Sequence, residues 1–465
     1  MEPHATINEP PATAPPPPLH WPVRTQLELH QELHARPALP ARSPCVVSYW
    51  VHWGMDAGHA HAALTALCLA SGAAAPAADV RHHVLQAAGY AVKFERHGEF
   101  VSWQLNRPLE SGDVHEDAGA LRALLFDSQA LAGLPDAFTR ALSAEGAGQM
   151  LAAAHVTMLR AADADDLLPR CRALVAAQAG RAGGDDAASV MGAWIGDARR
   201  GALLTSLRLS PDGFTRFALL DFGLPHDQAA REAQRLCEIE AYRMLAMLGF
   251  PLAQREAAQL AEMERALQGA VDALASQDTH DDARAFDTLT ALAAEVEHAT
   301  ARTRYRFSAT RAYHRIVERR LADLREQRIE GVQTLSGFLG RRFAPAMEFC
   351  DSTDRRLTDI AERIGRAVGL ARVRIEMHRE AGNQELLKAL AHRQKLQLRL
   401  QQTVEGLSVV AISYYALGLV GYLAKASKSL APQINPDVVA GIALLPVLAG
   451  AAWFIHRLRR HLAHD

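Results

Sequence analysis

Residues 406–424 read GLSVVAISYYALGLVGYLA and residues 438–455 read VVAGIALLPVLAGAAWFI. Neither stretch contains an Asp, Glu, Lys or Arg. As α-helices rising about 1.5 Å per residue they are roughly 28 and 27 Å long, close to the roughly 30 Å hydrocarbon thickness of a bilayer. The alternative is a pair of buried core helices, which are usually shorter and keep a polar stripe. We therefore predict a transmembrane hairpin over residues 405–465, with a basic C-terminal end.

The charges that flank the two stretches predict their orientation. Basic residues lie before the first stretch and after the second: Lys388, Arg393, Lys395, Arg399, Arg457, Arg459 and Arg460. The connector between the stretches, KASKSLAPQINPD (425–437), is short, and its charged residues are only Lys425, Lys428 and Asp437. Because basic residues are retained on the cytoplasmic side, both ends of the chain are expected in the cytoplasm and the connector outside. Residues 1–20 are rich in proline and lack the apolar core of a signal peptide, so we expect a disordered tail.

The composition narrows the class of protein. The chain has 465 residues, with 50 Lys and Arg against 52 Asp and Glu, a formal charge of −2 that argues against a nucleic-acid partner. Apolar residues make up 49%, enough to build a core and to exclude wholesale disorder. The cysteines occur singly, which argues against a disulfide framework or a zinc ribbon and fits a reducing compartment: Cys45, Cys68, Cys171, Cys237 and Cys350.

Residues 21–225 mix strand and helix signals. Strand-like runs, rich in β-branched and aromatic residues, are found at 43–53, 90–94, 100–105, 187–195, 203–209 and 214–220, with a further one at 155–159. A helix follows Asp56, and Pro211 and Gly213 make a turn between the last two runs. Strands joined partly by hairpins and partly by helices predict an α+β cytoplasmic domain, a sandwich with a mostly antiparallel or mixed sheet.

Residues 226–404 are predicted to be a helical stalk domain. Helical patterns cover 226–248, 252–276, 281–328 and 341–380, and Gly382-Asn383 is a place where the last of them could kink. Coiled-coil-like packing is predicted by the 4-3-4-3-4 spacing of Leu357, Ala361, Ile364, Val368, Ala371 and Ile375. Leu386, Leu390, Leu400 and Val404 continue a similar pattern up to the first apolar stretch.

Few residues point to chemistry. The sequence has no phosphate-binding loop, no dinucleotide fingerprint and no serine-hydrolase elbow, and the AGGDD loop at 182–186 lacks the Lys-Ser/Thr ending that holds phosphate. His30 and His34 do not match the zinc motif H-E-x-x-H, because Glu32 does not follow the first histidine directly. Surface positions are the favoured interpretation of the densest group of histidines: His52, His59, His61, His82 and His83. We therefore expect no catalytic, cofactor-binding or metal residue, and no enzyme activity.

An arginine-rich stretch covers residues 302–328, with Tyr305, Phe307 and Tyr313 interleaved. Such a stretch could hold phosphate or lipid headgroups. Its own acids, Glu318, Asp323 and Glu326, favour a solvated helix face with salt bridges.

Several blocks resemble a bacterial family of predicted membrane-anchored proteins of unknown function. They are ELHARP (32–37), EGVQT (330–334), FLGRR (338–342) with PAM (345–347), and LRLQQTVEGLSVVAISYY (398–415). The resemblance implies a membrane anchor, which we expect at the bacterial inner membrane. It implies nothing further, because no activity is assigned to the family.

The layout is also similar to that of the CorA-type magnesium channels, which have a cytoplasmic α/β domain, long helices and a short external loop. The Gly-Met-Asn signature of those channels is absent, because the corresponding place reads GYLAK (421–425). That departure argues against selectivity for Mg²⁺.

Two functions follow as hypotheses. The first is an interaction or scaffolding module anchored in the membrane, and the alternative is a homo-oligomeric ion channel or transporter. In the channel, first spans would line a pore through Ser408, Ser413, Tyr414, Gly418 and Gly421, with Lys425 and Lys428 at the outer mouth. A cationic mouth favours anions over Mg²⁺. The expected partners are the membrane and further copies of the chain.

Overall fold

The computed structural model describes residues 29–30, 39–109, 117–127, 131–181, 190–276, 279–427 and 435–462. The chain divides into two compact units: unit 1 is residues 1–266 with 292–363, and unit 2 is residues 267–291 with 364–465. The predicted fold class is confirmed in its main features, which are an N-terminal α+β domain, long helices and an apolar C-terminal helix.

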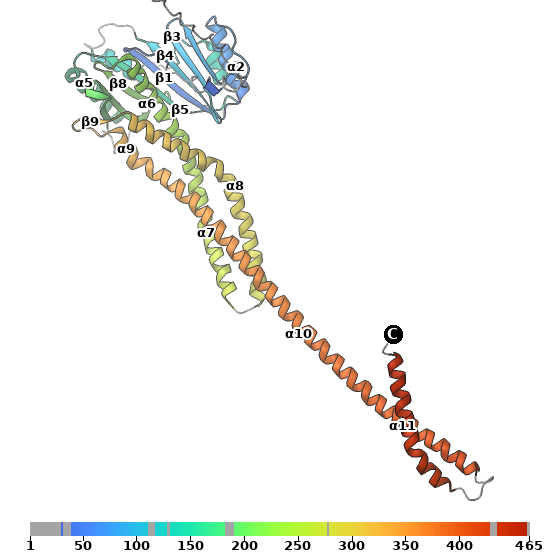
Figure 1. The fold of residues 1–465 in the computed structure, drawn as a ribbon. Coiled ribbons are helices and arrows are strands. Elements are labelled where there is room, and N and C mark those ends of the chain that lie inside the picture. The colour runs from blue at the N-terminus through green and yellow to red at the C-terminus, as the bar shows by residue number, and fades with distance from the viewer. Residues whose placement is uncertain are drawn as a thin grey trace, which may run out of the picture. The chain divides into compact units, whose positions relative to one another are not determined.

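Unit 1 contains a nine-stranded sheet in the order β2-β3-β4-β1-β5-β8-β7-β6-β9 (Figure 1). Its strands are β1 (Cys45–Trp53), β2 (His82–Ala87), β3 (Tyr90–Arg96), β4 (Phe100–Pro108), β5 (Gln149–Arg160), β6 (Met191–Ile195), β7 (Gly201–Leu209), β8 (Thr215–Asp221) and β9 (Gln327–Arg328). All neighbouring pairs are antiparallel except β5 and β8, which are parallel. The mixed sheet is thus one of the two predicted kinds. β2 and β9 are additions to the predicted strands, and β9 lies at the end of a segment predicted as helix.

One face of the sheet is covered by short helices. Trp50 of β1 lies opposite Trp103 of β4 and Ala153 of β5, so these side chains share a face. That face packs against α2 (Ala57–Ala70) and α4 (Asp136–Leu142) in one cluster, and against α3 (Ala118–Arg122) and α5 (Ala164–Arg181) in another. Asp56 caps α2, as the sequence predicts, by accepting the N–H of His59 at 2.9 Å.

The opposite face of the sheet packs against α6 (His226–Met247). Thr215 of β8 is buried there and its hydroxyl donates to Glu240 of α6 at 3.0 Å. Arg243 also donates to Glu240, at 2.7 Å. A buried carboxylate is stable only when its charge is compensated, so this contact fixes α6 on the sheet.

The remaining helices are α7 (Gly249–Ala275), α8 (Thr279–Asp323), α9 (Leu335–Arg342), α10 (Ala344–Ser427) and α11 (Pro436–Leu462). α10 has 84 residues and continues through Gly382, where the sequence would allow a kink. α8 ends at Asp323, five residues before the predicted end. The buried seam of α10 also differs from the predicted one, because Ile360 and Ala367 are buried in place of Ala361 and Val368.

Several arginines of α8 in unit 1 are ion-paired, mainly with acids on other elements: Arg302, Arg306, Arg311 and Arg320. Arg302 lies 3.0 Å from Glu256 of α7, and Arg311 lies 2.9 Å from Asp351 of α10. Of the acids expected to pair, Asp323 lies 3.4 Å from Arg320, whereas Glu326 accepts the first N–H groups of α9. The predicted charged face therefore serves to hold helices together.

The family block at residues 330–334 adjoins an edge of the sheet. β9 pairs with β6, and Gly192 of β6 donates its N–H to the carbonyl of Gln333 at 2.8 Å. Thr334 then caps α9 by accepting the N–H of Gly337 at 3.1 Å. The block thus ends the sheet and begins a helix.

In unit 2, an ion-pair cluster joins the end of α7 and the beginning of α8 to the middle part of α10. Asp282 of α8 is 2% exposed and lies 3.2 Å from Arg374 Nε and 3.1 Å from His378 Nδ1, both on α10. Arg374 also donates to the carbonyl oxygens of Leu274 and Ser276, at the end of α7. One guanidinium group therefore satisfies a helix end and a buried acid together.

Glu99, between β3 and β4, makes a largely buried contact with α8 in unit 1. Its carboxylate accepts hydrogen bonds from Arg306 and, at 2.6 Å, from the hydroxyl of Tyr313. The side chains of Glu99 and Arg306 are only 10% and 14% exposed. Burial alone raises the pKa of Glu99, but the hydrogen bonds from Arg306 and Tyr313 outweigh it and the pKa is lowered.

Replacing Glu99 is expected to destabilise unit 1. Glu99→Gln leaves the Arg306 charge buried without a carboxylate, so the free energy of unfolding should fall by roughly 3 kcal/mol. Urea unfolding of the detergent-solubilised protein, followed by tryptophan fluorescence, measures this loss. Glu297→Gln, at an exposed position on α8, is the matched control and should change little. Equal effects of the two substitutions would contradict the prediction.

The same substitution should change the acid sensitivity of the protein. A carboxyl group with a lowered folded-state pKa stabilises the fold above its unfolded pKa of about 4.3, and the stabilisation is lost as pH falls through the folded-state value. Wild-type protein should therefore lose more stability below pH 4 than Glu99→Gln does. Parallel acid profiles would contradict the assignment.

Candidate functional site

The end of α10 and α11 form an apolar pair of helices in unit 2. Among the described residues, these two helices are long and apolar enough to cross a membrane. Only 11% and 6% of their most apolar windows are buried inside the protein. Core helices of soluble proteins have the same composition but are mostly buried, so the exposure of these windows favours a lipid environment.

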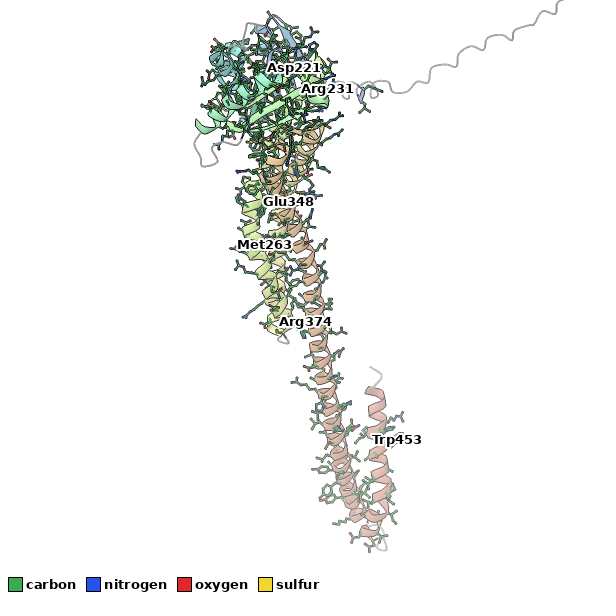
Figure 2. All side chains as sticks on the ribbon, turned by 90° about the vertical axis from the view of Figure 1, so that its left-hand side faces the viewer. Asp221, Arg231, Met263, Glu348, Arg374 and Trp453 are labelled. Carbon is green, nitrogen blue, oxygen red and sulfur yellow. The ribbon has the colours of Figure 1, made fainter. Side chains whose placement is uncertain are left out.

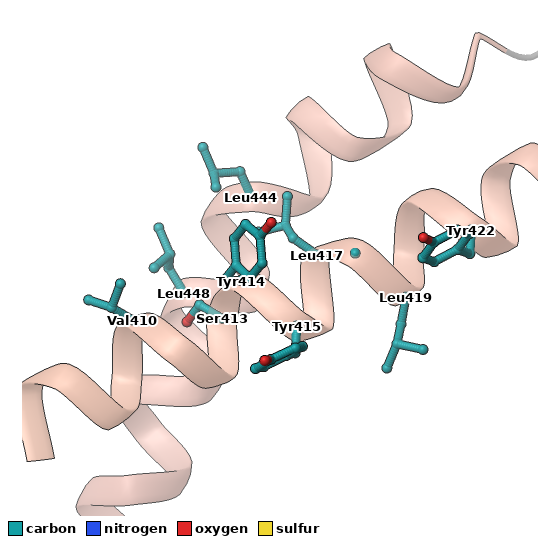
Figure 3. A pocket seen from close by; sticks show the side chains of 10 residues that line it. Val410, Ser413, Tyr414, Tyr415, Leu417, Leu419, Tyr422, Leu444 and Leu448 are labelled. Carbon is teal, nitrogen blue, oxygen red and sulfur yellow. The ribbon is translucent and has the colours of Figure 1, made fainter.

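A cavity of about 740 Å³ lies along the α10 side of this pair (Figure 3). Tyr414, Tyr415 and Tyr422 line it from α10, and Leu444 and Leu448 line it from α11. The rings of Tyr414 and Tyr415 meet edge to face, with centroids 5.9 Å apart. The lining is therefore aromatic and aliphatic, with hydroxyl groups as its polar component.

The structure brings together three of the five predicted pore residues. Ser413, Tyr414 and Gly418 line the cavity, and Ser413 is 3% exposed with a hydroxyl oxygen that has no hydrogen-bond partner among the described residues. Ser408 does not line the cavity and donates its hydroxyl to the carbonyl of Val404 at 2.9 Å. Gly421 is also outside the lining.

The two predicted outer-mouth lysines have different outcomes. Lys425 is exposed near the end of α10, and Lys428 lies outside the described residues.

On α11, the guanidinium of Arg457 lies 5.2 Å from the ring of Trp453, which Figure 2 labels. A tryptophan beside an arginine at the end of an apolar helix is typical of a membrane–water interface.

The histidines are dispersed by the fold. His59 contacts Asp56 at 2.7 Å, His61 contacts the carbonyl of Pro76 at 3.1 Å, and His83 lies 3.5 Å from the sulfur of Cys68. His52 differs from the predicted surface position, because it is 6% exposed and burial lowers its pKa to about 4. No group of three possible metal ligands occurs within the described residues. His34 and the AGGDD loop lie outside them.

Buried acids are the charged residues that the sequence analysis does not single out. Glu232, Glu240, Glu256 and Asp282 are each less than 5% exposed. A usable signal exists on α6, where Glu232-x-x-Arg235 and Glu240-x-x-Arg243 place an arginine one turn after each acid. Glu99, Glu256 and Asp282 pair with residues far along the chain, so no local spacing reveals them.

Comparison with known protein families identifies the family to which the chain belongs. The model of DUF3422, a family described as protein of unknown function, matches residues 20–462, and the chain belongs to this family. No curated protein and no solved structure matches the chain significantly. The match covers all the blocks on which the resemblance to an uncharacterised family rests, and it assigns no activity.

An arginine within the first apolar stretch should prevent stable membrane insertion. Leu419 is 64% exposed on α10, and placing Arg near the centre of a span costs about 2.5–3.5 kcal/mol. Leu419→Arg should therefore increase the fraction of the chain released from membranes by alkaline carbonate washing. Leu398→Arg, at an exposed position of α10 before the stretch, is the control and should leave that fraction unchanged. Equal release by both variants would contradict the membrane assignment.

Proposed function

We propose that this protein is anchored in the bacterial inner membrane by α10 and α11, and that it acts there as an interaction or scaffolding module. The exposure of two apolar helices carries the proposal, since these surfaces require a non-aqueous environment. α10 supports it further, because one helix contains both a buried seam (Leu357 to Ala371) and the first apolar stretch.

The charge distribution supports a topology with both ends in the cytoplasm. More basic residues precede the first span and follow the second than lie in the connector, where only Lys425 and Lys428 are basic. On this topology the α+β domain lies on the cytoplasmic side, where single, buried cysteines remain reduced.

A second copy of the chain is the partner that we propose for α10. Residues 376–404 form a helix exposed on every side, and it carries the apolar side chains Leu386, Leu390, Leu400 and Val404. A partner for this face must run alongside α10 up to the membrane surface. Another α10 satisfies this requirement, because its apolar residues occur at the same depth.

The alternative function is a homo-oligomeric channel with a CorA-like layout. It is favoured by the clustering of Ser413, Tyr414 and Gly418 on one cavity. The burial of Ser413 beside α11 argues against it, because a pore residue must face the axis between copies. The exposed Lys425 would in any case favour anions over divalent cations.

The number of subunits separates the two functions. Light scattering of the detergent-solubilised protein, corrected for bound detergent, should give a dimer if α10 pairs with a second copy. Leu400→Glu with Val404→Glu should then yield monomers, because like charges would face each other, whereas Gln401→Glu should not. A closed ring of four or more subunits, together with conductance in liposomes, would favour the channel. A wild-type monomer would overturn the pairing of α10.

Cysteine labelling tests the topology. All five native cysteines are buried, and burial raises the pKa of Cys45 and Cys171 to about 12, so background labelling should be low. Lys425→Cys should react with an impermeant maleimide from the outside of intact spheroplasts, and His456→Cys only after lysis. The reverse pattern would contradict the proposed orientation.

A further inference from the structure

A polar cavity of about 360 Å³ lies in unit 1 where β6, α6 and the end of α8 meet. Arg231, Glu232 and Arg235 line it from α6, and Asp323 and Arg325 line it from the end of α8 and the residues after it. Arg231 is exposed and is labelled in Figure 2. Three arginines around one small cavity form a potential anion site, because guanidinium groups present several N–H donors in a fixed plane.

The acids near the cavity are compensated from within the fold. Asp323 lies 3.4 Å from Arg320, which also pairs with Glu238 outside the cavity. Arg235 donates to Glu232 Oε1 at 2.6 Å. Among the described residues that line the cavity, the three arginines outnumber the two acids, Glu232 and Asp323.

Glu232 is an unusual residue within this site. It is 2% exposed, and its second oxygen, Oε2, has no hydrogen-bond partner of good geometry among the described residues. Burial raises the pKa of Glu232, although Arg235, Gln228 and Arg231 oppose the rise. In its protonated form this carboxyl group can donate a hydrogen bond.

The backbone around the cavity is held in uncommon conformations. Arg325 has φ +50°, and Ala198 and Arg199, close after Gly196, have φ +58° and +55°. Gly196 itself has φ +70° and donates its N–H to the carbonyl of Leu324 at 3.3 Å. Residues other than glycine rarely adopt the left-handed backbone conformation, and those that do often cluster at functional sites.

We propose that this cavity binds a phosphate group, and that Arg231, Arg235 and Arg325 hold its oxygens. As the anion takes the Arg235 guanidinium, Glu232 accepts a proton from solvent and donates it in a hydrogen bond to the ligand. The phosphate belongs either to a small soluble molecule or to a phospholipid headgroup. The site does not depend on the proposed scaffolding function.

Sulfate titration of the full-length, detergent-solubilised protein tests the site. Sulfate keeps its double charge between pH 5 and 8, so any pH dependence of binding comes from the protein. Calorimetry at constant ionic strength should show one saturable site per chain, tighter at pH 5.5 than at pH 8. Besides Glu232, the charged groups facing the ligand are Arg231 and Arg235 from α6 and Asp323 and Arg325 from the end of α8.

Variants assign the binding to these residues. Arg231→Ala with Arg325→Ala should weaken sulfate binding at least tenfold, since charge-assisted hydrogen bonds are lost. Arg355→Ala, at an exposed position of α10, should bind like wild type. Glu232→Gln imitates the protonated acid, so it should bind more tightly at pH 8 and remove most of the pH dependence. Unfolding temperatures show whether each variant is folded.

The outcomes are distinct. The absence of a saturable site, or unchanged affinity in the double arginine variant, overturns the proposal, and an unchanged pH profile in Glu232→Gln overturns the proton uptake. Nanodiscs of phosphatidylcholine with or without phosphatidylglycerol identify the source of the phosphate. Weaker sulfate binding in the discs that contain phosphatidylglycerol assigns a lipid headgroup. Equal sulfate binding in both kinds of disc, together with weaker binding when glycerol 3-phosphate is added, assigns a soluble ligand.

Discussion

The continuity of α10 is the constraint on which the rest of the protein depends. Over 84 residues every internal N–H has a helical partner, so the chain can leave a packed bundle and enter an apolar stretch without exposing an unsatisfied backbone group. Isolated helices in water derive little stability from their own hydrogen bonds. The exposed segment at 376–404 therefore needs stability from what packs on it, which is why a partner for α10 is part of the proposed function.

Local patterns were sufficient to predict much of the fold. The strands at β3 and β4, the turn at Pro211 and Gly213, and the helix after Asp56 each depend on neighbouring residues, and all are present. Features set by distant residues could not be predicted in this way. β2 shows only weak alternation of apolar and polar residues, and it joins the sheet by pairing with β3. The buried seam of α10 includes Ile360 in place of the predicted Ala361, because the helices that pack on α10 decide which side is buried.

The candidate sites likewise divide into those that local sequence reveals and those that depend on distant residues. The apolar stretches were evident from composition, and three of the predicted residues, including Ser413, do line one cavity. The cavity beside Glu232 was not predicted, since Arg325 is 93 residues away from it along the chain and its role follows from a tertiary contact. Charged residues that meet only in the folded protein have no spacing to reveal them.

The pairing of β9 with β6 has a consequence for solubility. Without residues 327–333, β6 would present a row of free N–H and C=O groups, and the side chains of β6 are mostly buried. Such an edge is a template for pairing with another chain. A two-residue strand followed by a capped helix closes that edge with very little sequence. Closing this edge removes a site for aggregation, and the EGVQT block contributes to it through the carbonyl of Gln333.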